Sequence, residues 1–206
     1  MEFSPKEILD KFDIGLSQVV CIYPYGSRVY GSHGPDSDHD WIIVYKSSLL
    51  PSGAFRDNAI SSDENKSHQA VCYSRSGFRN AIDTYDIVAL ECAFLSAGSP
   101  LMESMKFPIR KWVPKEMVAA VITKASASWH LAKMHSDDDE RTKKNAYHAL
   151  RILKFGEQMA EFGRIIDFSA TNQLRQEIGG DETFFRDKYL SMFNDSLSRM
   201  RMLANA

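Results

Sequence analysis

The chain has 206 residues, of which 44% are hydrophobic and 25% are charged, the balance of one ordinary folded domain or of two small lobes that share a core. Its net charge of −2 is unevenly spread: residues 1–106 hold nine Lys/Arg against 14 Asp/Glu, whereas residues 107–206 hold 16 against 13. The apolar runs are short, so we expect no membrane span, and the start lacks a basic patch followed by an apolar stretch, so we expect no secretory signal. The three cysteines lack CxxC spacing and are too few for a disulfide framework. Together these features predict a cytoplasmic protein.

The first predicted element is a capped helix that begins at Ser4. Pro5 suits the first helical position, and Glu7 completes a capping box with Ser4. The β-branched and aromatic runs at 19–23 and 41–45 then predict two buried strands on either side of a stretch rich in glycine and serine.

Residues 46–68 are polar and show no periodicity, so we expect a long surface loop or a lid. Two further strands are expected at 70–73 and 81–85. A helix follows from about Asp86 and ends near residue 98.

The second half of the chain is predicted to be helical. Helices are expected from Pro114, over 141–162 and over 181–203, from apolar residues that recur at helical spacing. The predicted fold class is therefore α+β: a small mixed sheet with flanking helices over residues 1–110, and a helical C-terminal lobe over residues 111–206.

The pair Asp38 and Asp40 stands directly before the second predicted strand. Because side chains two residues apart in a strand share a face, both carboxylates would lie together. Like charges at this separation need a cation or a proton, and Mg²⁺ is commonly held by one or two carboxylates together with substrate phosphates. An exposed turn capped by aspartates is the alternative interpretation.

Upstream, Gly26 and Ser27 follow the first strand, and Arg28 opens a possible helical turn. Glycine allows the backbone to approach a ligand closely, and free N–H groups attract phosphate. A serine hydroxyl and a guanidinium would add donors for phosphate oxygens. This segment is therefore a candidate phosphate cradle.

Together these residues resemble the polymerase β-like nucleotidyltransferases, whose signature is Gly-Ser, a spacer, and Asp-x-Asp running into a strand. The extended form, with Arg28, Gly31 and Ser37, is similar to small stand-alone members, namely the minimal nucleotidyltransferases of toxin–antitoxin pairs and the RNA-ligase-associated group. His39 departs from the pattern, because the broad family has an apolar residue there.

The resemblance implies a nucleotidyltransferase core that transfers a nucleoside monophosphate from an NTP, with ATP favoured, to an acceptor hydroxyl. Asp38 and Asp40 would hold two Mg²⁺ ions, with Mn²⁺ able to substitute, and Gly26, Ser27, Arg28 and Ser37 would bind the nucleotide. The family's third metal-site carboxylate lies on a later strand. Asp83 in the strand expected at 81–85 is our choice, with Asp86, also a suitable helix N-cap, as the alternative.

Lys144, His148 and Arg151 fall at i, i+4 and i+7, so they share one face of a helix. The surrounding segment, residues 143–153, again resembles the RNA-ligase-associated group. One interpretation is that this basic face contacts the nucleotide or an RNA acceptor. The alternative is that it is a solvated stripe beside the core.

The acceptor expected first is an RNA 3′ end, including that of tRNA, on the RNA-repair resemblance and the weakly basic second half. A protein hydroxyl that receives AMP is the second choice. A non-catalytic, antitoxin-type interaction module of the same fold is the rival from another class. The sequence does not decide the base preference or the oligomeric state.

Overall fold

The structure, a computed structural model, describes residues 3–47, 59–63, 67–134, 139–180 and 186–204. Contacts divide the chain into two units. Residues 1–83 with 88–110 form the first, called the sheet unit, and residues 84–87 with 111–206 form the second, called the helical unit. A mixed β-sheet with flanking helices and a set of further helices confirm the predicted α+β class.

Within the described part of the sheet unit, five strands form one sheet in the order β3-β4-β2-β1-β5. The central pair, β1 and β2, is antiparallel, while β4 runs parallel to β2 and antiparallel to the edge strand β3. The short strand β5 pairs antiparallel with the other side of β1. The strands span β1 (Val19–Tyr25), β2 (His39–Tyr45), β3 (Ala59–Ser62), β4 (His68–Tyr73) and β5 (Met102–Glu103).

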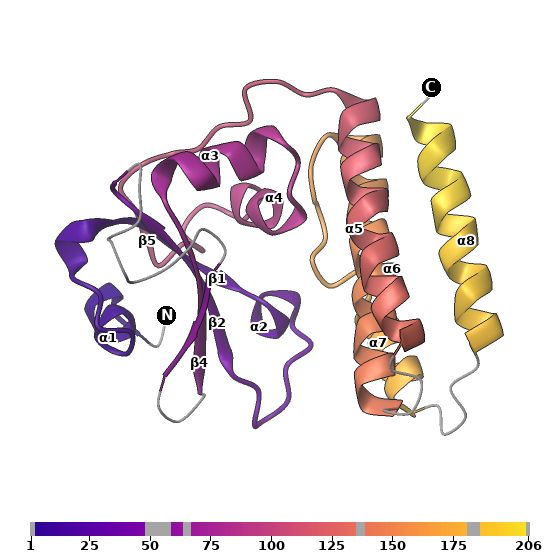
Figure 1. Ribbon diagram of the computed structural model, residues 1–206, viewed down its shortest axis with the longest axis horizontal. Helices are drawn as coiled ribbons and strands as arrows, with labels where there is room; N and C mark the ends of the chain where they lie inside the picture. Colours follow the sequence, from indigo (N-terminus) through magenta and orange to yellow (C-terminus); the bar gives the residue numbers. More distant parts are fainter. Residues whose placement is uncertain (1–2, 48–58, 64–66, 135–138, 181–185, 205–206) are drawn as a thin grey trace. The chain divides into compact units, whose positions relative to one another are not determined.

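Helices cover both faces of this sheet, which gives the sheet unit two apolar cores (Figure 1). Helix α1 (Pro5–Asp10) packs on the face that carries Trp41 and Ile43. Helices α3 (Arg75–Asp83) and α4 (Ile87–Ala93) cover the face of Ile42 and Val44. The alternation of β2 side chains between the two cores is what its apolar run predicts for a strand buried on both sides.

The predicted start of α1 is confirmed in detail. The Oγ atom of Ser4 accepts a hydrogen bond from the backbone N–H of Glu7, and Glu7 Oε2 accepts one from the backbone N–H of Ser4 at 2.6 Å. This capping box satisfies two backbone donors that a helix N-terminus otherwise leaves without partners. Ile8 and Leu9 then anchor the helix in the core.

Two predictions for the first half were wrong. Residues 59–62, expected in a loop, form the edge strand β3, because β4 offers them a partner that the local pattern does not reveal. Residues 81–83, expected in a strand, are the last part of helix α3. Phe78, Ala81 and Ile82 are buried on one side of α3, and their i, i+3, i+4 spacing outweighs the β-branched character of the end of the segment.

The helical unit contains the second-half helices. They are α5 (Pro114–Met134), α6 (Asp139–Phe162), α7 (Asn172–Gly180) and α8 (Arg186–Leu203). Figure 1 shows α5, α6 and α8 side by side, and Trp129 of α5 stacks on Phe193 of α8 with ring centroids 4.7 Å apart. Tyr85 fixes the start of this unit, because its hydroxyl donates to the carbonyl of Lys111 and accepts from the N–H of Val113.

Gly156 of α6 permits close packing between helices of the helical unit. A Cβ atom there would lie 2.6 Å from both Val121 Cγ1 and Met200 Cε. We expect Gly156→Ala to lower the free energy of unfolding of the helical unit by about 1–3 kcal/mol, because the rigid Val121 side chain cannot move aside as Met200 can. Urea unfolding followed by circular dichroism measures this, and an unchanged midpoint would show that the helices shift freely.

The thiols of Cys21, Cys72 and Cys92 are all buried. Among the helices in the described residues, none is both long and apolar enough to cross a membrane.

Candidate functional site

The predicted cradle and the second aspartate meet at the end of the central strand pair. Asp40 of β2 pairs with Tyr25 of β1, so Gly26 follows directly beside it. Gly26 has φ of +75°, and a Cβ atom at this position would overlap Asp40 Oδ2 and lie 2.8 Å from its Cγ. The carboxylate of Asp40 therefore lies against a bare stretch of backbone that only glycine can provide.

Arg28 holds the loop that carries the first aspartate. Its Nη2 donates to the carbonyl of Ser37 at 2.7 Å, and its Nε donates to the carbonyl of Asp38 at 3.2 Å. The Oγ atom of Ser37 accepts from the N–H of Gly34 and closes the same turn. Arg28 and Ser37 thus position Asp38 next to the start of β2, and a direct contact of either side chain with phosphate remains a prediction.

Ser27 begins the predicted short helix, now observed as α2 (Ser27–Tyr30), which ends at Gly31 with φ of +71°. The hydroxyl of Tyr30 in α2 donates to Glu91 Oε2 of α4 at 2.5 Å. Glu91 is 2% exposed. This buried hydrogen bond connects α2, and with it Gly26 and Ser27, to α4, which covers the face of the sheet that carries Ile42 and Val44.

Sequence reasoning missed Glu91. The available signal was an acid in an otherwise apolar helix: Leu90 is completely buried beside it, and such a position is unusual for a carboxylate unless it has a partner.

Asp83 does not join the aspartate pair. It lies at the end of α3, where its half-exposed carboxylate pairs with Arg79 at 3.5 Å. Helix α3 starts at Arg75, just after the end of β4 that pairs with Val44, whereas Asp40 lies at the other end of β2. Across the described residues, no group of three or more His, Cys, Asp or Glu side chains could hold a metal ion. The expected triad of Asp38, Asp40 and Asp83 is therefore not assembled.

The residues that are present fit one divalent ion better than two. Asp38 directly precedes β2 and Asp40 is its second residue, and the Asp40 carboxylate lies in the space that a Cβ atom at Gly26 would take. Mg²⁺ is commonly held by one or two carboxylates, with water and substrate phosphates as the other ligands. A second ion held by a third carboxylate has no support in this arrangement.

The three predicted basic residues of α6 differ in exposure. Lys144 is exposed, His148 is partly buried and Arg151 is only 3% exposed. The guanidinium of Arg151 lies over the ring of Phe155, 5.7 Å from its centroid. The face thus runs from solvent into the interior of the helical unit, and its contact with a nucleotide or RNA stays a prediction.

His148 does not add charge to this face at neutral pH. Burial, and then the nearby cations Arg151, Lys144 and Arg175, lower its pKa from 6.5 to about 3. Below pH 6.5 the His148 imidazole therefore binds a proton in the unfolded chain but stays neutral in the folded chain. The free energy of unfolding consequently falls as the pH drops from 6.5 toward 3.

We expect this linkage to cost about 1–2 kcal/mol between pH 7 and pH 5. The measurement is the difference between the wild-type and His148→Gln unfolding free energies at the two pH values, since subtraction removes the other titrating groups. A difference that is the same at both pH values would contradict the low pKa.

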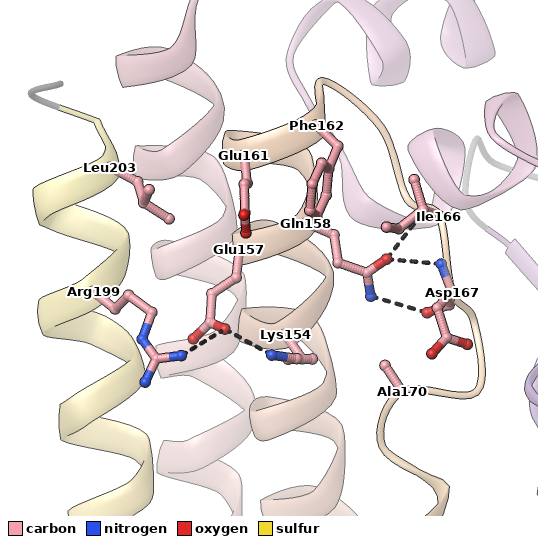
Figure 2. A pocket seen from close by; sticks show the side chains of 10 residues that line it. All are labelled: Lys154, Glu157, Gln158, Glu161, Phe162, Ile166, Asp167, Ala170, Arg199 and Leu203. Atoms are coloured by element: carbon pink, nitrogen blue, oxygen red, sulfur yellow. Dashed lines mark hydrogen bonds and ion pairs between the residues drawn. The ribbon is translucent and has the colours of Figure 1, made fainter.

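A separate hollow of about 460 Å³ lies entirely within the helical unit and shares no residue with the predicted site (Figure 2). One wall is held by Gln158, whose Oε1 accepts from the N–H groups of Ile166 and Asp167 and whose Nε2 donates to the carbonyl of Asp167. The buried carboxylate of Glu157 pairs with Lys154 at 3.1 Å and with Arg199 at 3.6 Å. The full lining is Lys154, Glu157, Gln158, Glu161, Phe162, Ile166, Asp167, Ala170, Arg199 and Leu203.

Comparison with known proteins adds little to this picture. No protein-family model matches the chain, and no curated protein matches it. A solved structure, the nucleotidyltransferase-like protein from Exiguobacterium sibiricum 255-15, aligns with 98% of this chain and 73% of its own length, at a TM-score of 0.37 and 10% sequence identity. A similarity this remote says nothing about what this chain does, so function must be inferred from its own side chains.

Proposed function

We propose that the sheet unit is a nucleotidyltransferase that binds an NTP with Mg²⁺ and transfers its nucleoside monophosphate to an acceptor hydroxyl, with an RNA 3′ end as the first choice. The observation that carries the proposal is the contact between Gly26 and Asp40. A backbone with φ of +75° lies directly against a carboxylate, with Asp38 two residues away. The motif resemblance supplies the reaction type.

Each side chain of the site has a defined task in this proposal. Asp38 and Asp40 would hold the ion that accompanies the triphosphate, and the backbone at Gly26 and the hydroxyl of Ser27 would hold the β- and γ-phosphates. Arg28 keeps the loop of Asp38 in place through its two bonds to backbone carbonyls. When bound, Mg²⁺ would neutralise phosphate charge and lower the pKa of a hydroxyl next to it.

In the transfer step, the acceptor oxygen bonds to the α-phosphorus while the bond from the α-phosphorus to the bridging oxygen breaks, and pyrophosphate leaves. Because Asp83 is not part of the pair, we assign the hydroxyl proton to solvent. The protein's contribution is alignment of the reacting atoms and fixed charge around them.

The choice of RNA rests on the resemblance of residues 143–153 and on the excess of basic residues after position 106. We propose that Lys144, which is exposed on α6, is the first residue of this segment to test for RNA contact. A protein hydroxyl as AMP acceptor is the alternative substrate.

One observation favours a second candidate, a non-catalytic module that binds NTP or a partner on the same fold. Asp83 lies apart from Asp38 and Asp40, and no described acid completes a metal-binding group with them. Such a module would bind Mg²⁺ and ATP without turnover.

Incubation with α-labelled ATP, Mg²⁺ and either total RNA or cell protein tests the proposal. Label in RNA that is lost after a 3′ exonuclease supports transfer to an RNA end, and label in protein supports AMP transfer. Binding of ATP without incorporation into either would favour the non-catalytic module, and failure to bind any NTP would refute the transferase and every form of the module that binds NTP.

A further inference from the structure

The strand next to Asp40 carries an amide where a further carboxylate could stand. Asp40 of β2 and Gln69 of β4 are register partners in the parallel pair. Neighbouring strands lie about 4.8 Å apart, so the two side chains are adjacent if they share a face of the sheet.

The packing on both sides of the sheet shows that they do share a face. The rings of the preceding partners, His39 and His68, stack at 4.9 Å, and Trp41 Nε1 donates to His68 Nδ1. These rings and Trp41 lie on the face covered by α1. Asp40 and Gln69 therefore point to the opposite face.

The residues that follow confirm this alternation. The core under α3 and α4 contains Ile42, which lies two residues after Asp40. Tyr73, four residues after Gln69, lies in the same core, and Val71, two residues after Gln69, packs against it. Tyr25, the partner of Asp40 on β1, packs against the same core. Gln69 is partly buried, as are Asp38 and Asp40. The amide thus lies beside Asp40, on the face where Gly26 makes its close approach.

An amide oxygen is a hard, neutral ligand. Cations that prefer oxygen ligands can bind it together with carboxylates. We propose that Gln69 is the third oxygen donor of the site, and that its lack of charge limits the site to one divalent ion that binds together with the triphosphate. This inference rests on the proposed nucleotide-binding function. The two carboxylates and the neutral amide together offer two negative charges to a cation, whereas a third carboxylate would offer a further charge and a ligand for a second ion.

The test counts bound Mn²⁺ by electron paramagnetic resonance, with and without the non-hydrolysable analogue α,β-methylene-ATP. For the wild type we expect one Mn²⁺ per chain when the analogue is present and weak binding without it. Gln69→Glu should tighten Mn²⁺ binding at least about tenfold, or add a second ion, because a third negative charge stands beside Asp40. Gln69→Ala should weaken the single ion about tenfold or less.

Gln18→Glu is the matched control. It adds the same charge to an exposed residue at the other end of the sheet, where the carbonyl of Gln18 accepts from the N–H of Lys46. This variant should leave Mn²⁺ binding unchanged. Circular dichroism establishes that each variant is folded, and Gln69→Ala keeps the test valid if Gln69→Glu does not fold.

The outcomes separate this inference from the proposed function. If both Gln69 variants bind Mn²⁺ as the wild type does while Asp40→Asn binds none, Gln69 is not a ligand and the nucleotide site still stands. Two ions in the wild type would also overturn the inference. If Asp38→Asn and Asp40→Asn both keep wild-type binding of Mn²⁺ and the analogue, the proposed site itself is wrong.

Discussion

Asp40→Asn and Asp38→Asn should each lower nucleoside monophosphate transfer by at least about 10²-fold while the protein stays folded. Each change removes one of the two negative charges that would hold the ion against the triphosphate. The measurement is incorporation of α-labelled ATP at saturating Mg²⁺, together with the dissociation constant for Mg²⁺ and α,β-methylene-ATP.

Two further aspartates make this prediction specific. Asp36→Asn is the matched control, since Asp36 is exposed in the same loop and should tolerate the change. Asp83→Asn distinguishes the sequence-based assignment from the structure. Because Asp83 pairs with Arg79 on α3 and does not join the pair, we expect near-normal transfer from this variant. Loss of transfer in Asp83→Asn would restore Asp83 as the third carboxylate, and full activity of Asp40→Asn would refute the site.

Gly26→Ala should abolish binding of NTP and lower the free energy of unfolding by about 1–3 kcal/mol. Two physical effects add at this position. Alanine is strained at φ of +75°, and its Cβ would push the Asp40 carboxylate out of place. Isothermal titration with α,β-methylene-ATP and urea unfolding measure the two effects separately.

Gly98 offers the control for backbone strain alone. It has φ of +85°, yet nothing lies within 4 Å of a Cβ at that position. Gly98→Ala should therefore lose stability but keep nucleotide binding. If Gly26→Ala bound the analogue as well as Gly98→Ala does, the close approach to Asp40 would have no part in the site.

Local features of the fold were predictable wherever neighbouring residues decide the structure. The capping box of Ser4 and Glu7 was recognisable because both partners lie within one helical turn. The buried strands at β1 and β2 followed from continuous β-branched and aromatic runs. Gly26 and Asp40 could likewise be selected from residue types and motif spacing, whereas the positive φ of Gly26 and its contact with Asp40 are visible only in the structure.

Errors arose where distant segments compete to pair or pack. The end of α3 resembles a strand over a few residues, and only its packing through Phe78 against the sheet makes it a helix. Edge strand β3 forms because β4 offers an open side for pairing. Helix α7 was not predicted at all, and residues 181–185 of the expected last helix lie outside the described residues.

The sequence alone was enough to identify the glycine-serine turn, the aspartate pair and the α+β class. Each of these is encoded in the residue types and spacings of short stretches of the chain. The proposed third ligand, Gln69, could be found only in the folded chain. Whether Asp83 or Gln69 stands beside Asp40 depends on the pairing of β2 with β4, strands that begin 29 residues apart, at His39 and His68. That register is set by which side chains enter the two cores, and a shift of one residue would turn Gln69 to the opposite face.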